Sequence, residues 1–96
     1  MTESEIQTKI LRWAEKISEV WIVKYPGGTY GRKGVPDLIL SVKGRFLAIE
    51  VKKPGGKTSQ IQLLEQEKIR STGSRSEIVE CVDEAKKIIL EVWNGE

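Results

Sequence analysis

The chain has 96 residues, with 16 Lys and Arg against 14 Asp and Glu and a formal net charge of +2. This length suits one small domain, so we expect a single domain over residues 1–96. Charged residues make up 31% of the chain with both signs interspersed, which excludes a disordered polyelectrolyte. No apolar run approaches the roughly 20 residues that cross a bilayer, and the polar start is unlike a secretory leader. We therefore expect an intracellular protein without a membrane segment.

The sequence has no histidine and a single cysteine, Cys81. The absence of histidine excludes Ser-His-Asp and Cys-His catalysis as well as histidine-based zinc sites. One cysteine cannot form an internal disulfide, and its valine neighbours predict a buried structural thiol. Any catalysis would therefore depend on carboxylates, lysines or a metal ion. With an isoelectric point near 8.7, affinity for nucleic acid would have to come from local clusters of basic residues.

The first half of the chain predicts a helix, a strand and a loop. Residues 3–19 form an amphipathic helix, because apolar side chains recur at three- and four-residue intervals: Ile6, Ile10, Trp13, Ala14 and Ile17. Thr2 is expected to cap this helix, with Glu5 completing a capping box. Residues 20–25 are rich in Val, Trp and Ile, which favours a strand. The basic, glycine-rich residues 26–34 predict a flexible surface loop.

Two apolar runs then predict a hairpin. Residues 35–42 and 45–52 are separated by Lys43 and Gly44, a connection length typical of a tight antiparallel turn. Neither run alternates strictly between apolar and polar residues. We therefore expect both strands to be covered on both faces of the sheet.

The rest of the chain predicts a helix, a strand and a final helix. After a Gly/Pro break at residues 53–57, a helix capped by Thr58 or Ser59 should run to about residue 71, with its apolar residues inward: Ile61, Leu64 and Ile69. A strand over residues 76–82 and a helix over residues 84–93, capped by Asp83, complete the chain. The order αβββαβα indicates an α/β domain in which helices flank a mixed central sheet.

The hairpin brings two carboxylates together. Counting outward from the turn, Leu38 faces Ile49, and Asp37 faces Glu50. Lys52 lies on the same face, since side chains alternate with period two. Opposed like charges destabilise a strand pair, and a hard divalent cation with oxygen ligands would compensate for them. A salt bridge between Lys52 and one of the acids is the alternative, and spacing alone leaves both open.

At these residues the chain resembles a known family. Val35-Pro36-Asp37, twelve further residues and Glu50-Val51-Lys52 are similar to the PD-(D/E)xK nuclease signature. The surrounding sequence resembles the VRR-NUC (virus-type replication-repair nuclease) branch, from the N-terminal ESEIQ segment through the hairpin glycine and the KPGGK break to Gln62. The resemblance implies a restriction-endonuclease-like core, whose αβββαβ order is the one derived above.

The resemblance also implies roles for individual residues. Asp37, Glu50 and the main-chain carbonyl of Val51 would bind Mg²⁺ or Mn²⁺, and Lys52 would orient the attacking water and stabilise charge on the phosphate. Gln62 would hydrogen-bond the water or Lys52; by itself it reads as a solvated helix residue.

The family further uses a glutamate from the first helix, where this chain has two. Glu3 falls on the inward stripe and Glu5 on the outer face, so Glu3 is the choice for a catalytic and metal-binding role. The alternative is that both glutamates only complement the positive end of the helix.

Basic residues flank this site on both sides. The loop before Asp37 and the one after Lys52 carry candidate DNA contacts: Lys24, Tyr30, Arg32, Lys33, Lys53 and Lys57. Lysine and arginine would attract phosphates, while Tyr30 could stack on a base. Nothing resembles a recognition helix, which favours structure-selective binding. Alternatively, these loops are merely solvated.

The expected function is a Mg²⁺- or Mn²⁺-dependent endodeoxyribonuclease acting on branched DNA such as a four-way Holliday junction, in replication, recombination or repair. The resemblance to stand-alone, phage or bacterial members also implies a homodimer, with Val92 and Trp93 as interface candidates. Trp13 and Trp21 are interpreted as core or interface residues. No small-molecule cofactor is expected. The alternatives are a non-catalytic nucleic-acid-binding module of the same fold and an adaptor that dimerises through its last helix.

Overall fold

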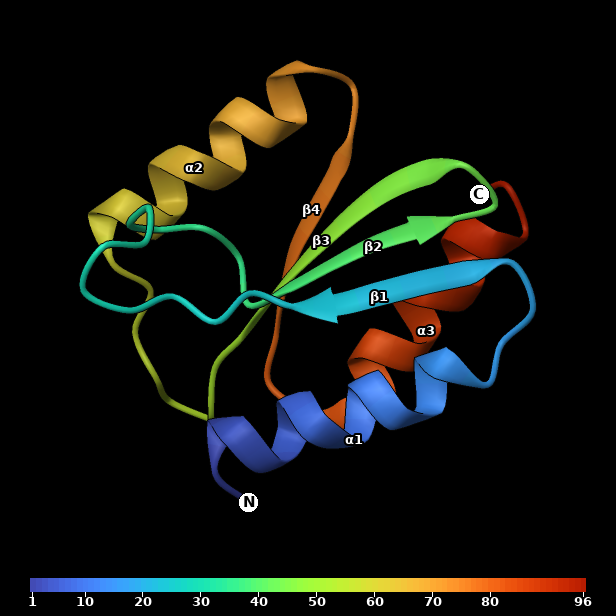
Figure 1. Ribbon diagram of the computed structural model, residues 1–96, viewed down its shortest axis with the longest axis horizontal. Coiled ribbons are helices and arrows are strands. Elements are labelled where there is room, and N and C mark those ends of the chain that lie inside the picture. Colours follow the sequence, from blue (N-terminus) through green and yellow to red (C-terminus); the bar gives the residue numbers. More distant parts are fainter.

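A computed structural model describes residues 1–96 and contains the expected order of elements (Figure 1). The helices and strands are α1 (Glu3–Glu15), β1 (Val20–Lys24), β2 (Leu38–Val42), β3 (Arg45–Val51), α2 (Gln60–Ser71), β4 (Arg75–Val79) and α3 (Val82–Trp93). The predicted αβββαβα order is confirmed. The last strand ends three residues earlier than expected, and α3 begins before Asp83, with Cys81 at its N-cap position and no side-chain cap.

The four strands form one mixed sheet in the order β1-β2-β3-β4. Strands β1 and β2 pair antiparallel, as do β2 and β3, whereas β4 runs parallel to β3, so the chain crosses over through α2. In the hairpin, Leu38 pairs with Ile49 and Val42 with Arg45, as the sequence predicts. Lys43 and Gly44 both have positive φ, of 50° and 81°, which suits the two-residue turn that joins twisted antiparallel strands.

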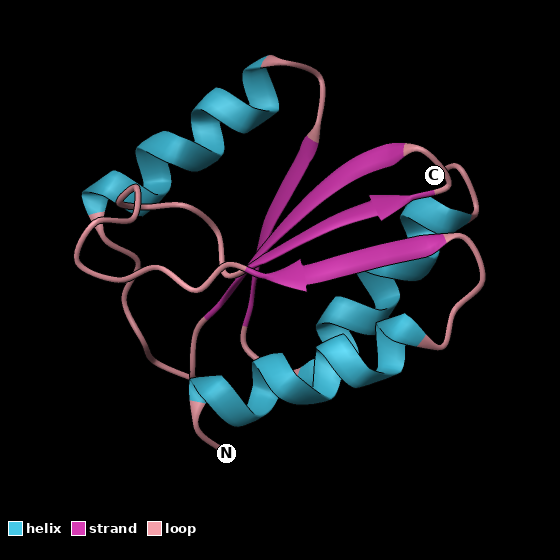
Figure 2. Cartoon of the chain, in the orientation of Figure 1, coloured by secondary structure: helices cyan, strands magenta, loops and turns pink.

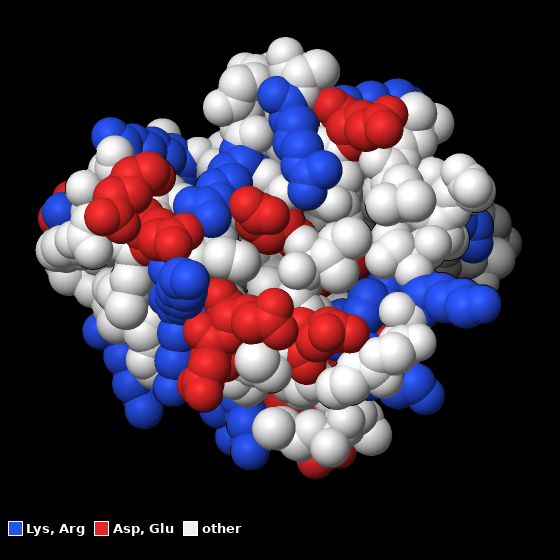
Figure 3. Space-filling model, turned by 180° about the vertical axis from the view of Figure 1, so that it is seen from behind, with Lys and Arg blue, Asp and Glu red and all other residues white.

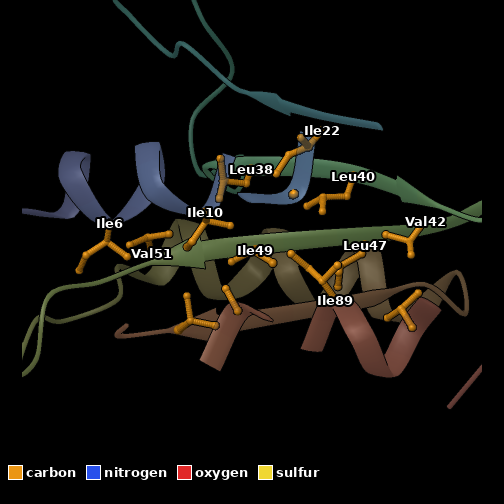
Figure 4. Close-up of a cluster of buried hydrophobic side chains, with 14 residues drawn as sticks. Ile6, Ile10, Ile22, Leu38, Leu40, Val42, Leu47, Ile49, Val51 and Ile89 are labelled. Carbon is orange, nitrogen blue, oxygen red and sulfur yellow. The ribbon is translucent and has the colours of Figure 1, made fainter. Parts of the chain in front are cut away.

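One face of the sheet carries the hydrophobic core. Helices α1 and α3 cover this face, and α2 lies on the opposite side (Figure 1). Figure 4 shows the buried cluster between the strands and these two helices. It consists of Ile6, Ile10, Ala14, Ile22, Leu38, Leu40, Val42, Leu47, Ile49, Val51, Val79, Ala85, Ile89 and Val92. The expected inward stripe of the first helix is confirmed at Ile6, Ile10 and Ala14, but the helix ends at Glu15 rather than at residue 19, and Ile17 lies outside it and outside the core.

The other face of the sheet is only partly covered. Trp21 pairs with Ser41, which pairs with Phe46, so the three residues form one row across β1, β2 and β3. Trp21 is 58% exposed and Phe46 is 42% exposed. The expectation that both hairpin strands are covered on both faces is wrong at this end of the sheet. The reason is that α2 packs mainly against β4 and leaves this row open. Trp21 is not a core residue, and its alternative place in a subunit interface stays a prediction.

Helix α2 is oriented differently from the sequence-based expectation. Ile61 and Leu64 are 52% and 51% exposed, whereas the polar Gln66 is buried. The prediction that Ile61 and Leu64 face inward is therefore wrong. The predicted cap is confirmed at Ser59, whose hydroxyl accepts from the backbone of Gln62.

Two residues near the C-terminus also differ from expectation. Val92 belongs to the core, and the indole nitrogen of Trp93 donates to the carbonyl oxygen of Ser18 at 2.9 Å. The ammonium of Lys43 lies 3.3 Å from the centre of the same indole. These residues are thus used within the subunit, which argues against them as a subunit interface. Cys81, expected to be buried, is exposed because it lies just outside the first turn of α3.

No helix in the structure combines the length and the hydropathy needed to cross a membrane.

Candidate active site

Asp37 and Glu50 meet at one end of the sheet. Asp37 immediately precedes β2, and Glu50 is the penultimate residue of β3, so the antiparallel pairing places both at the same end. The two longest loops, residues 25–37 and 52–59, leave the sheet at this end (Figure 2). The surface pockets of the molecule do not include Asp37, Glu50 or Lys52. Glu50 is buried, whereas Asp37 and Lys52 are partly exposed at this end of the sheet.

Asp37 is fixed by hydrogen bonds to both neighbouring strands. Its Oδ2 accepts from the backbone nitrogen of Val51 at 2.7 Å, and its carbonyl oxygen accepts from the backbone nitrogen of Tyr25 at 2.8 Å. The first bond holds the carboxylate against the end of β3. The proximity of Asp37 to the Glu50 strand, inferred from counting outward from the turn, is thus present in the structure.

Glu50 is a buried carboxyl group with an incomplete set of partners. It is 1% exposed, and its Oε2 has no hydrogen-bond partner within the chain. Burial raises the pKa of Glu50 to about 9, with the hydrogen bond to Asp37 and the repulsion from Asp37 acting in the same direction. Without a bound cation, Glu50 would therefore carry a proton at neutral pH. A cation that replaced this proton would compensate both carboxylates.

Lys52 lies just beyond the end of β3. Its backbone nitrogen donates to the carbonyl oxygen of Val79 at 2.9 Å, which continues the pairing of β3 with β4 and fixes the lysine backbone. Its ammonium lowers the pKa of Glu50, so its charge acts on the site. Lys52 is not among the residues that form ion pairs within 4.0 Å. The structure therefore contains no salt bridge between Lys52 and Asp37 or Glu50, which was the alternative interpretation.

Glu3 and Glu5 have different surroundings. Glu5 completes the predicted capping box, since its Oε1 accepts from the backbone nitrogen of Thr2 at 3.0 Å. Glu3 instead reaches the segment after Lys52, where its Oε2 accepts from the backbone nitrogen of Lys53 at 3.1 Å. Its charge also raises the pKa of Glu50. No three carboxylates come close enough together to form a metal site by themselves, so a ligand role for Glu3 stays a prediction.

Gln62 has a structural function in the first turn of α2. Its side-chain oxygen accepts from the backbone nitrogen of Ser59 at 2.9 Å, completing a capping box. It makes no hydrogen bond to Lys52. A catalytic role for Gln62 also stays a prediction, and it would use the amide nitrogen or the second lone pair of the amide oxygen.

The predicted DNA contacts lie at the end of β1 and on the two loops that flank the site. Lys24, Tyr30, Lys33, Lys53 and Lys57 have exposed side chains. Arg32 is also exposed, but its guanidinium forms an ion pair with Glu65 on α2 at 2.9 Å. This pairing lowers the pKa of Glu65. Arg32 is therefore already paired within the chain, and a role of the flanking lysines in DNA binding stays a prediction.

The loop between β1 and β2 is anchored rather than free. The hydroxyl of Tyr25 accepts from the backbone nitrogen of Arg32 at 2.9 Å. Gly34 lies against α2, where a Cβ would come within 2.5 Å of the Ile61 side chain, and its φ of +79° also favours glycine. The loop expected to be flexible is thus tied to β1 and to α2. Sequence reasoning did not identify Tyr25, since a tyrosine at a strand end carries no distinct signal.

The face of the molecule seen from behind the view of Figure 1 has no continuous basic surface. Figure 3 shows acidic and basic side chains interspersed there, with several acidic residues close together near its centre. The modest net charge of +2 is therefore not spread evenly.

Comparisons with known proteins agree on one family. A family profile described as the VRR-NUC domain matches residues 1–83. A solved structure titled "VRR_NUC domain protein" is similar with a TM-score of 0.79 at 23% identity, over 95% of this chain and 87% of that one. Another, titled "VRR_NUC domain", has a TM-score of 0.76 at 27% identity, over 93% and 96% of the two chains. The first likeness shows the fold alone. No curated protein matches the sequence.

Proposed function

Since the chain belongs to the VRR-NUC domain family and has its nuclease-type fold, we propose that it is a metal-dependent endodeoxyribonuclease that hydrolyses phosphodiester bonds. The observation that supports this proposal is the contact of Asp37 with the buried Glu50, close to Lys52 at one end of the sheet. Two carboxylates in this arrangement repel each other, which is unfavourable unless a cation or a proton compensates them.

The residues of the site fit a hard divalent cation such as Mg²⁺ or Mn²⁺. The buried Oε2 of Glu50 has no partner, and oxygen donors are what these ions prefer. Asp37, Glu50 and the carbonyl oxygen of Val51 would hold the ion, with Glu3 as an additional carboxylate at the edge of the site. When bound, the ion would lower the pKa of water and offset charge on the phosphate.

The side chains of the chain itself would orient the reactants. The bond from Val51 to Asp37 keeps that carboxylate in place before any ligand binds. Lys52, free of ion pairs, would orient the attacking water and stabilise the negative charge that develops on the phosphate. Gln62 would assist through its side-chain amide. None of these roles requires histidine, which the chain lacks.

DNA would be held by the flanking loops. Lys33 and Lys57 lie on opposite sides of the site in sequence and have exposed side chains, together with Lys24, Lys53 and Tyr30. Their attraction for phosphates is independent of sequence. We assign branched DNA, such as a four-way junction, as the preferred substrate, with a homodimer placing two sites on symmetry-related strands. Light scattering of the purified chain would determine the oligomeric state.

Cleavage assays test the proposal. Labelled four-way junction, flap and linear duplex are incubated in parallel with Mg²⁺, with Mn²⁺ and with EDTA. We expect metal-dependent cutting of the branched substrates at symmetric positions, absent from Glu50→Gln. Salt-sensitive binding without cutting would instead favour a non-catalytic nucleic-acid-binding module. The absence of both would leave the adaptor alternative.

A further inference from the structure

Three buried polar side-chain atoms on the α2 side of the sheet have no hydrogen-bond partner within the chain. They are Oε2 of Glu50, Nε2 of Gln66 and Oγ of Ser76. Each of these residues is about 1% exposed. Buried polar groups in folded proteins are nearly always paired with protein or ordered water, so three unpaired atoms in one region require an explanation.

The strand register places Ser76 and Glu50 on the same face. Ser76 pairs with Ala48, and Glu50 follows Ala48 by two residues on β3. Because side chains alternate along a strand, Ala48, Glu50 and Ser76 all point to the side of the sheet on which α2 lies. Side chains in adjacent rows lie about 7 Å apart on the diagonal, and the other two positions around this diagonal are the small Ala48 and Ile78. One water molecule can bridge such a gap.

Gln66 joins this region through Arg70. The guanidinium of Arg70 donates to the carbonyl oxygen of Ser76 at 2.6 Å and to Oε1 of Gln66 at 3.3 Å. The amide oxygen of Gln66 is therefore engaged and its nitrogen is left with two unused donors. The hydroxyl of Ser76 can both accept and donate, and an ionised Glu50 can only accept. A chain of hydrogen bonds can therefore run from the Gln66 amide to the Ser76 hydroxyl and from there to the Glu50 carboxylate.

We infer that Gln66 and Ser76 are positioning residues for Glu50, connected to its Oε2 through a bridging water above Ala48. The amide of Gln66 orients the serine hydroxyl, and donation toward Oε2 holds the carboxylate in one orientation and favours its charged form. The inference rests on the proposed function, since it concerns how the chain presents Glu50 to a divalent cation. A merely structural pairing of Gln66 with Ser76 would leave cation binding unchanged.

An isosteric pair of variants tests the role of the hydroxyl. Ser76→Thr retains the hydroxyl, whereas Ser76→Val introduces a side chain of the same size as threonine but without a hydroxyl. Mn²⁺ binding is measured by calorimetry on the full chain without DNA, with Glu50→Gln as the control for binding elsewhere. We expect Ser76→Val to weaken Mn²⁺ binding about tenfold and Ser76→Thr to stay within about twofold of wild type. Equal affinities for the two variants would overturn the inference.

A second pair tests the glutamine. Gln66→Leu removes the buried amide, and Gln60→Leu makes the same change at an exposed position of the same helix. We expect weaker Mn²⁺ binding only in Gln66→Leu, measured at a temperature at which both variants are fully folded. A loss of binding that merely followed a lower melting temperature would indicate a structural role.

A metal-free measurement separates this inference from the proposed function. Melting temperatures in EDTA are compared for Ser76→Val, Glu50→Gln and the double variant. Residues that share a network give non-additive shifts, whereas independent residues give additive ones. If the wild-type protein binds no Mn²⁺, this result contradicts the proposed function, and with it the positioning role of Gln66 and Ser76 in cation binding. Additive shifts would show that Ser76 and Glu50 are not connected, and would overturn the inference even where Mn²⁺ binds.

Discussion

The two faces of the sheet differ in composition and in purpose. The face covered by α1 and α3 holds the whole apolar cluster, and the side chains of that cluster are all hydrophobic. The face toward α2 has Glu50, Gln66 and Ser76 buried, while Trp21 and Phe46 are substantially exposed. One face therefore supplies most of the hydrophobic stabilisation, and the other carries polar groups that are unfavourable for the isolated fold.

This difference indicates how a domain of 96 residues accommodates a charged site. Strand β3 belongs to both faces, since Ile49 lies in the core and its neighbour Glu50 lies in the site. Alternation along one strand is enough to separate the two environments. The comparison predicts that substitutions one residue apart will have opposite effects on stability and activity.

The largest effect is expected for the carboxylates. Glu50→Gln and Asp37→Asn should each reduce DNA cleavage by on the order of a thousandfold or more, about 4 kcal/mol of transition-state free energy. Single-turnover cleavage with Mg²⁺ measures this loss, and circular dichroism verifies folding. Retention of wild-type cleavage in either variant would contradict the proposed mechanism.

The neighbouring core position should behave in the opposite way. Ile49→Ala removes a fully buried side chain next to Glu50 and should lower the free energy of unfolding by about 2–5 kcal/mol. Urea denaturation measures this change. At a temperature where the variant remains folded, its cleavage rate should stay close to wild type. A large stability loss in Glu50→Gln, comparable with that in Ile49→Ala, would contradict the division between the faces.

The pH dependence of stability should reveal the burial of Glu50. Its pKa is raised from 4.5 to about 9 in the folded protein, so the unfolded chain releases this proton at a lower pH. The metal-free protein should therefore lose stability as pH rises from about 4.5 to about 9, with a contribution of up to about 1.4 kcal/mol per pH unit. Thermal unfolding in EDTA at several pH values, compared with Glu50→Gln, isolates this contribution. Parallel profiles for both proteins would show that Glu50 is not responsible.

A smaller effect is expected for the loop residues. Lys33→Ala should weaken DNA binding and reduce the slope of log affinity against log salt by about one. Arg32→Ala should change this slope less, because its guanidinium already pairs with Glu65. Fluorescence anisotropy at several salt concentrations measures both slopes. A larger effect from Arg32 than from Lys33 would show that the ion pair opens when DNA binds.

The smallest effect is expected on the outer side of α2. Leu64→Gln should change the free energy of unfolding by less than about 1 kcal/mol, since this side chain is 51% exposed. Chemical denaturation provides the measurement. If Leu64 instead faced the sheet, as its sequence position suggests, the substitution would cost several times more.

Local pattern was sufficient for the elements and for the central part of the site. Helical periodicity identified α1, and the two-residue turn fixed the hairpin register, which placed Asp37 beside the strand that carries Glu50. These features depend on residues close in sequence, where spacing determines geometry. The capping boxes at Thr2 and Ser59 follow the same rule.

Only the tertiary structure decided which faces are buried and which polar groups have partners. Ile61 and Leu64 predicted the inward side of α2, but this helix packs over β4 with Gln66 inward. The pairing of Arg32 with Glu65 and the contact of Glu3 with Lys53 join segments 33 and 50 residues apart. Such contacts depend on how helices dock on the sheet, and that depends on the summed packing of the chain rather than on any local pattern.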